Sequence, residues 1–364
     1  MEQLQNRKKE SGKLAAMILI LLVVFLSACS SQSSNGTQSG GGSNTAEKNV
    51  ENSTGNTGNT GNTESTIEQV TISTITGWPV NDPTCIGYEL FVDKVTEKSG
   101  GAIEFDYKGG PESIPAFEQA EAVKNGVVDF ACNATSYYYD QMPESAAYTY
   151  SEISAEEERA NGAYDLFNEI NHKKMNVHII GRGTNPGPVI YSKVPLDSLE
   201  DLKGFRIRSS PAYLPVINSL GADVVTMPGG EIYTALERGI IDGFAWPALG
   251  AVGMGWHEQI KYKYYPEFAK SDVVYIMNLD KWNSLSEEVQ SILTEALVEV
   301  EQELPVIYQG LYEEEEKTLK ENGVEVLKFA ETEALLKIAA DAGWEWIREN
   351  APEYADQLEE KFRK

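Results

Sequence analysis

One short run of basic residues near the middle of the chain has the residue types and spacing to bind a carboxylate. Residues 199–208 read LEDLKGFRIR, a turn followed by a short strand. Because side chains alternate along a strand, Phe205 and Ile207 point to one face, and Arg206 and Arg208 to the other. At a strand end that faces a cleft, a guanidinium can hold a carboxylate through two parallel hydrogen bonds. The alternative is that Arg208 only pairs with an acidic residue at the surface.

The strongly negative net charge of the chain makes anionic binding partners unfavourable. There are 30 Lys and Arg residues against 56 Asp and Glu residues, which gives a formal net charge of -26. Nucleic acid is therefore an unfavourable partner, because binding it requires cations that neutralise phosphates. The overall field also repels an organic anion, so a local fixed cation has to supply the attraction.

Residue patterns typical of enzymes and metal sites are missing from the sequence. The three histidines form neither a His-x-x-His nor a His-Glu-x-x-His pattern, and there is no Gly-x-Ser-x-Gly elbow or Walker-type phosphate loop. We therefore expect no catalytic residues, no metal ligands and no cofactor. Cys85 and Cys132 are either buried thiols or a disulfide, and the sequence leaves both open.

The first 65 residues have the sequence patterns of an export signal and a linker, and we expect the folded domain to begin after them. A basic segment and an apolar run from Leu14 to Leu26 predict a signal peptide over residues 1–28. The sequence Leu-Ser-Ala-Cys that ends at Cys29 resembles a bacterial lipobox, which implies that Cys29 is diacylated and anchors the protein to the cell membrane. Residues 29–65 are rich in Ser, Gly, Asn and Thr and predict a flexible linker, as in Gram-positive lipoproteins. An ordinary cleaved signal peptide or an uncleaved anchor is the alternative.

Alternating strand and helix patterns follow this leader. Strands are predicted at residues 70–75, 102–107, 127–131, 177–180, 189–192, 205–208 and 240–244, and helices at 88–98, 116–125, 287–322 with a break at Pro305, and 330–364. This order predicts an α/β fold of two lobes, each a mostly parallel sheet flanked by helices. Hinge strands and a long helix would join the lobes. The predicted bounds are 66–190 with 271–305 for the first lobe, and 191–270 with 306–364 for the second.

Four segments together resemble the solute-binding subunit of tripartite ATP-independent periplasmic (TRAP) transporters, of the dicarboxylate-binding type. They are 199–208, 229–243 (GGEIYTALERGIIDG), 120–129 (AEAVKNGVVD) and 278–285 (NLDKWNSL). The resemblance implies a two-lobed fold like that of periplasmic binding proteins, capture of an organic acid between the lobes, and delivery to a small and a large integral membrane subunit. The carboxylate-clamping arginine of the family falls on Arg208. Arg206 falls where the family usually has Lys, and we expect it at the surface.

Two departures from the family pattern bear on the ligand. Pro188 occupies the position where many acid-binding members carry a second arginine. Ala245 precedes Trp246, where the oxo-acid branch has a glutamate, so we expect no metal-bridged ligand. The remaining pocket has one arginine and aromatic walls, which favours a monocarboxylate with an apolar or aromatic body over a short dicarboxylate.

Further pocket residues are expected on loops that follow strands and near the motifs. With Arg208 and Trp246, the predicted ligand-binding residues are Trp78, Glu112, Tyr137, Tyr138, Tyr233 and Phe244. Trp78 could equally be a packed loop residue. Other functions remain open: a binding protein of an ATP-driven (ABC) importer, an extracytoplasmic ligand sensor, or an exported enzyme.

Overall fold

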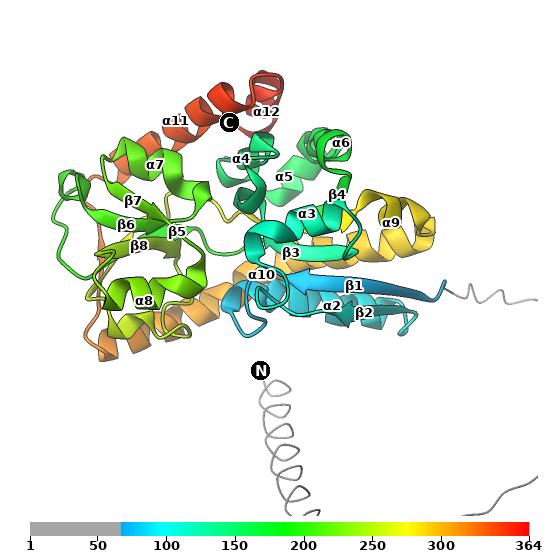
Figure 1. The fold of residues 1–364 in the computed structure, drawn as a ribbon, viewed down its shortest axis with the longest axis horizontal. Helices are drawn as coiled ribbons and strands as arrows, with labels where there is room; N and C mark the ends of the chain where they lie inside the picture. Colours follow the sequence, from blue (N-terminus) through cyan, green and yellow to red (C-terminus); the bar gives the residue numbers. More distant parts are fainter. Residues whose placement is uncertain (1–66, 364) are drawn as a thin grey trace, which may run out of the picture. The chain divides into compact units, whose positions relative to one another are not determined.

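Two β-sheets with flanking helices organise residues 67–363, the part of the chain that the computed structural model describes (Figure 1). The predicted signal peptide, the lipobox residue Cys29 and the linker over 29–65 lie outside the described residues. Within residues 67–363, no helix has the length and apolar character needed to cross a bilayer.

The first sheet has five strands in the order β2-β1-β3-β10-β4. Their bounds are Val70–Thr76 (β1), Ile103–Tyr107 (β2), Phe130–Ala134 (β3), Val177–Arg182 (β4) and Val273–Asn278 (β10). Strand β1 runs parallel to β2 and β3, whereas β10 runs antiparallel to β3 and β4.

The second sheet has six strands in the order β11-β9-β5-β8-β6-β7. Their bounds are Pro188–Ser192 (β5), Arg206–Ser209 (β6), Asp223–Thr226 (β7), Gly243–Pro247 (β8), Tyr262–Tyr265 (β9) and Glu325–Lys328 (β11). Strand β5 runs antiparallel to β8 and β9, and the other pairs are parallel.

Each sheet is therefore mixed, and the two reversed strands are those that enter from the other lobe. The chain passes from β4 to β5 through residues 183–187, and from β9 to β10 through residues 266–272. Each crossing leaves one sheet and enters the other at the carboxyl ends of the parallel strands. The strand that follows the crossing therefore starts at those ends and is antiparallel to both of its neighbours. The two-lobed α/β fold is confirmed, with a hinge strand in each sheet.

Two strands begin three residues later than the sequence predicted. Strand β3 starts at Phe130 and not at Val127, and β8 starts at Gly243 and not at Ile240. Val127 is 68% exposed and Ile240 is 48% exposed, each directly after a glycine with positive φ. In both lobes a helix thus ends at a glycine in the left-handed conformation, and the apolar residue after it faces solvent before the strand begins.

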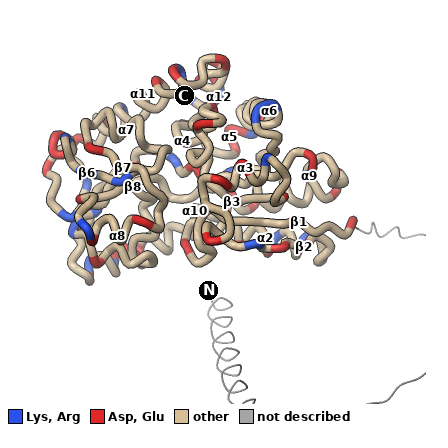
Figure 2. Tube along the Cα trace, viewed as in Figure 1, with Lys and Arg blue, Asp and Glu red and all other residues tan. Residues whose placement is uncertain are grey.

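Helices cover both sheets. Next to the first sheet are α2 (Ile86–Lys98), α3 (Gln119–Lys124), α4 (Ala146–Thr149), α5 (Ala155–Ala160), α6 (Ala163–Met175) and α9 (Leu279–Ser284), and next to the second are α7 (Leu214–Ser219) and α8 (Ile232–Glu237) (Figure 1). Acidic and basic residues are interspersed along the chain in both lobes (Figure 2). Arg206 is at the surface as expected, where its Nη2 lies 2.7 Å from Oδ1 of Asp242.

The long helix α10 (Glu287–Glu321) contacts both β4 and β11 and so belongs to both lobes. The predicted break at Pro305 is wrong, since the helix continues through it. Proline lacks the N–H that would bond the carbonyl of Glu301. The hydroxyl of Thr184, in the first crossing, donates to that carbonyl at 2.9 Å and replaces the missing bond.

The C-terminal segment forms α11 (Thr332–Asn350) and α12 (Ala355–Phe362). Trp344 and Phe362 are fully buried. The predicted second lobe includes all of 306–364. In the structure α11 contacts both α7 of the second lobe and α4 of the first, and α12 packs against α4 and α6 of the first. The reason is the Phe362 ring, which lies 5.7 Å from the ring of Tyr148 in the core beside β4.

Candidate binding site

A pocket lies where strand ends of both sheets meet the two crossings. Segments far apart in the sequence line it: the loop after β1, the ends of β3, β6 and β8, both crossings, and the middle of α10. Aromatic side chains form much of its wall: Trp78, Tyr137, Tyr213, Trp246 and Tyr308. The carboxyl ends of strands are the usual ligand position in open α/β sheets.

Arg208 lines this pocket and is fully buried. Its Nε and Nη2 donate to the carbonyl of Met227 at 2.9 and 2.8 Å, and its Nη1 donates to the carbonyl of Ala245 at 3.1 Å. No carboxylate of residues 67–363 forms an ion pair with it. Burial lowers the pKa of Arg208 from its usual value, against the charges of nearby groups that raise it. The guanidinium is thus oriented by neutral carbonyls and lacks a counter-ion.

Trp246 covers the guanidinium. The Arg208 Cζ atom lies 5.1 Å from the centroid of the Trp246 ring. The indole packs edge-on against Trp256 at 4.9 Å and 86°. A Cβ at Gly229 would lie 2.6 Å from the Trp246 ring, so the glycine of the 229–243 motif leaves room for this tryptophan.

Trp78 and Tyr137 lie on the wall contributed by the first lobe. Their ring centroids are 5.9 Å apart, and each residue is 7% exposed. Thr76, the last residue of β1, donates its hydroxyl to the carbonyl of Trp78 at 2.8 Å and fixes the turn into the pocket. With Arg208 and Trp246, these are the predicted ligand-binding residues that the structure brings together.

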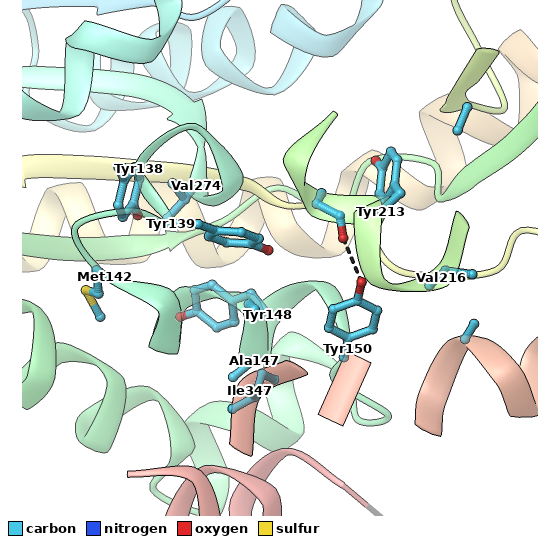
Figure 3. Packing of buried hydrophobic residues seen from close by; sticks show 14 of the residues in the cluster. Tyr138, Tyr139, Met142, Ala147, Tyr148, Tyr150, Tyr213, Val216, Val274 and Ile347 are labelled. Carbon is cyan, nitrogen blue, oxygen red and sulfur yellow. Dashed lines mark hydrogen bonds between the residues drawn. The ribbon is translucent and has the colours of Figure 1, made fainter. Parts of the chain in front are cut away.

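Two of the other predicted residues lie in protein cores instead of the pocket lining. Tyr138 follows Tyr137 on a 3-10 helix, where successive side chains diverge by about 120°, and it is buried in the hydrophobic cluster of Figure 3. Phe244 shares a strand face with Trp246 but lies two residues farther from the strand end. There it stacks on Tyr191 at 4.7 Å.

The remaining two have local roles at turns and at the surface. The Glu112 carboxylate accepts a hydrogen bond from the backbone N–H of Gly110 at 2.7 Å, which closes the turn after β2. These backbone bonds lower the pKa of Glu112. The Tyr233 hydroxyl lies 3.3 Å from Oε2 of Glu258 on the outer side of α8. Neither lines the pocket.

Several lining residues escaped the sequence analysis, because they come from the crossings and from α10. Asn185 in the first crossing donates its Nδ2 to the hydroxyl of Tyr308 at 2.8 Å, and that hydroxyl donates to the carbonyl of Pro83 at 3.1 Å. Asp272 in the second crossing accepts from the backbone N–H of Ser136 at 3.3 Å. The Pro, Gly and Ser content of the crossings marks them as loops but does not say which side chains meet.

Asp272 is a buried carboxyl in the same pocket as Arg208. Burial raises its pKa, and the opposing influences are hydrogen bonds from Ser136 and the charge of Arg208. Its backbone carbonyl also accepts from the N–H of Thr135 at 2.9 Å, so it ties the second crossing to the end of β3.

Residues 67–363 contain no group of three or more His, Cys, Asp or Glu side chains placed to hold a metal ion. Cys85 and Cys132 are free thiols in the core. Burial raises the pKa of Cys132 to about 12 and that of Cys85 further, so both are protonated at neutral pH.

One hydrogen bond joins the lobes beside the pocket. The hydroxyl of Tyr150, just after α4, donates to the carbonyl of Ala212, just after β6, at 2.7 Å (Figure 3). Tyr213, next to Ala212, lines the pocket. When the lobes are close enough for this bond to form, Ala212 is held in place, and with it the neighbouring Tyr213 of the pocket wall.

Comparison with protein families gives one match over most of the chain. The model described as "Bacterial extracellular solute-binding protein, family 7" matches residues 74–349. A monocarboxylate 2-oxoacid-binding periplasmic protein of Nostoc sp. is 27% identical over 287 residues, covering 76% of this chain and 78% of the relative. A C4-dicarboxylate-binding protein of Bacillus subtilis is 24% identical, covering 66% of this chain and 71% of the relative.

Solved structures share the fold. An extracytoplasmic solute receptor of Bordetella pertussis binding pyroglutamic acid has a TM-score of 0.71 at 21% identity, and the match covers 81% of this chain and all of the receptor. A TRAP periplasmic solute-binding protein of Desulfovibrio salexigens with bound orotic acid has a TM-score of 0.72 at 19% identity, covering 80% of this chain and 97% of that protein.

Proposed function

The chain belongs to family 7 of the bacterial extracellular solute-binding proteins, the family that its motifs indicated, and from this premise we propose that it captures a small organic acid for a TRAP transporter. The family consists of receptors that bind solutes and not of enzymes. The small and large integral membrane subunits of the transporter would receive the acid from the closed protein.

The single observation that carries this proposal is the state of Arg208. A guanidinium has five N–H donors, and three hydrogen bonds to Met227 and Ala245 leave one donor on each Nη atom. These two donors can meet both oxygens of a carboxylate. Because an isolated buried charge is costly, a carboxylate ligand supplies the counter-ion that Arg208 lacks among the described residues.

The pocket wall supports a monocarboxylate with an apolar or aromatic body. Among the described residues, Arg208 is the one basic side chain in the lining, so a second carboxylate would find no cation. Pro188, at the position of the second arginine in many relatives, begins β5 and supplies no charge. The five aromatic residues of the wall instead offer faces for an apolar body. The Nostoc relative is a monocarboxylate 2-oxoacid-binding protein by name.

Closure of the lobes would complete the site. The pocket draws its lining from both lobes, and Arg208 is fully buried. In the mechanism that we propose, the lobes separate about the two crossings and α10, the acid enters, and the lobes close over it. The Tyr150 bond to Ala212 would re-form in the closed state.

The location of the protein is also part of the proposal. We propose that Cys29 carries lipid and holds the protein at the outer face of the cell membrane of a Gram-positive organism. Two acyl chains on one residue suffice for stable anchoring. Expression with a labelled fatty acid should label the wild-type chain and not the Cys29→Ala variant. Label on both variants would contradict lipidation of this cysteine.

The experiment that tests acid binding is a thermal-shift and calorimetry screen of the purified protein. The panel contains aromatic and aliphatic monocarboxylates, amino acids, succinate and other dicarboxylates, and sugar acids. Ligands that bind only the folded protein raise its melting temperature by mass action. An acid that binds the wild type should not bind Arg208→Ala, which removes both free donors.

Arg206→Ala is the matched control. Arg206 lies on the same strand but pairs with Asp242 at the surface, so its removal should leave the affinity within about twofold. Circular dichroism checks that both variants fold. If no acid in the panel binds, or if Arg208→Ala binds as tightly as the wild type, the proposed function is wrong. A preference for succinate over every monocarboxylate would refute the proposed ligand class alone.

A further inference from the structure

The pocket holds a second polar group that a simple carboxylate ligand does not use. Asp272 is 7% exposed and accepts a hydrogen bond from the backbone N–H of Ser136 at 3.3 Å. Ser136 is 2% exposed, and its backbone N–H and side chain both favour the charged form of Asp272. Both residues line the same pocket as Arg208. We call Asp272 and Ser136 the acidic subsite.

A bound ligand changes which buried charges in the pocket have a partner of opposite sign. Of the lining residues, Arg208 and Asp272 are the two with ionisable acidic or basic side chains. A ligand carboxylate on Arg208 takes up the positive charge of the pocket. The negative charge of Asp272 then remains buried without a counter-charge, which is unfavourable in a site closed to water.

We propose that the ligand is a zwitterionic amino acid whose carboxylate binds Arg208 and whose ammonium group binds the acidic subsite. This inference rests on the proposed function and specifies its ligand class. The two charges of the ligand then each meet one buried charge of opposite sign, and the hydroxyl oxygen of Ser136, beside Asp272, can accept a further N–H. The aromatic wall covers the apolar side chain of the amino acid.

The test compares acids that differ only in the amino group. Isothermal titration calorimetry on the purified protein uses L-phenylalanine with 3-phenylpropanoate, L-valine with 3-methylbutanoate, and L-proline with cyclopentanecarboxylate. In the pair that fits the pocket, the amino acid should bind at least tenfold more tightly than its nitrogen-free partner. Asp272→Asn should weaken binding of the amino acid at least tenfold, whereas the nitrogen-free acid should bind the variant at least as tightly as the wild type, because the uncompensated charge is gone.

Asp82→Asn is the matched control variant. Asp82 is also a buried carboxyl, 4% exposed, and it accepts from the backbone N–H of Thr84 at 2.8 Å at the start of a 3-10 helix. It does not line the pocket, so Asp82→Asn should keep the preference for the amino acid.

The outcomes separate this inference from the proposed function. If acids bind through Arg208 but the nitrogen-free member binds as tightly, or if Asp272→Asn weakens both members equally, only the inference is overturned. If no acid binds, or if binding survives Arg208→Ala, the proposed function falls and the inference with it.

A second measurement covers the case in which Asp272→Asn does not fold. Titrations of the wild type in buffers of different ionisation enthalpy count the protons taken up on binding. The amino acid should bind with no net proton uptake, since the pocket stays balanced. The nitrogen-free acid should bring about one proton with it. Equal proton counts for both members would overturn the inference.

Discussion

Arg208 and Trp246 lie against each other on neighbouring parallel strands, with the guanidinium carbon 5.1 Å from the centroid of the indole ring. The ring covers one face of the guanidinium, while the carbonyls of Met227 and Ala245 take its inner donors. This arrangement orients the cation without using a carboxylate of the described protein. The predictions for Arg208 and Trp246 follow from this arrangement.

Arg208→Lys should lower the affinity for the bound acid at least tenfold, although it keeps the positive charge. A lysine ammonium is a compact point charge and cannot present two parallel donors to one carboxylate. Calorimetry measures the affinity, and thermal denaturation checks the fold. Unchanged affinity would mean that charge alone, without the fork geometry, holds the acid.

Trp246→Leu should weaken binding of an aromatic or apolar acid by about 1 kcal/mol or more, because it removes a wall of the pocket and the cation–π contact with Arg208. Phe244→Leu is the comparison on the same strand. Phe244 stacks on Tyr191 outside the lining, so its loss should lower the free energy of unfolding but leave the affinity nearly unchanged. Equal effects of both variants on affinity would contradict the placement of the pocket wall.

Thr184→Val should destabilise the protein by about 1–2 kcal/mol, because it leaves the carbonyl of Glu301 without the hydrogen bond that Pro305 cannot supply. Urea denaturation measures the change in the free energy of unfolding.

A double-mutant cycle with Pro305→Ala provides the control for this bond. Alanine restores the N–H at position 305, so the Glu301 carbonyl regains a helical partner. Thr184→Val should then cost less in the Pro305→Ala background than in the wild type. Additive effects would show that the hydroxyl and the missing N–H are not coupled.

His178 should make the protein less stable as the solution is acidified. Burial, together with smaller contributions from the neighbouring charges of His172 and Arg159, lowers its pKa to about 3. The unfolded chain, with a histidine pKa of about 6.5, binds the proton first. Stability is therefore lost as the pH falls from about 6.5 toward 3, at up to about 1.4 kcal/mol per pH unit.

His178→Phe should remove this part of the acid sensitivity, because phenylalanine can keep the 3.9 Å stack on Trp282 but cannot take up a proton. The free energy of unfolding, measured in urea at pH 7, 6 and 5, should fall less steeply for the variant than for the wild type. A constant difference between the two proteins at all three pH values would contradict the assignment.

From the sequence alone it was possible to predict the order of most strands and helices, the family, and Arg208 as the cation proposed to bind the ligand. These features depend on local periodicity and on motifs of adjacent residues: alternation along β6 places Arg208 opposite Phe205 and Ile207, whatever the rest of the chain does. The sequence also indicated the loop after β1 that holds Trp78.

Which other residues share the pocket depends on how the two lobes pack. Asp272 and Tyr308 join it because the second crossing and α10 pass the same strand ends as Arg208, although they lie far away in the sequence. Tyr138 and Phe244 are excluded because neighbouring elements bury them in the cores of the lobes. Periodicity reports the face on which a side chain lies, whereas a pocket depends on which distant faces the packing of two lobes brings together.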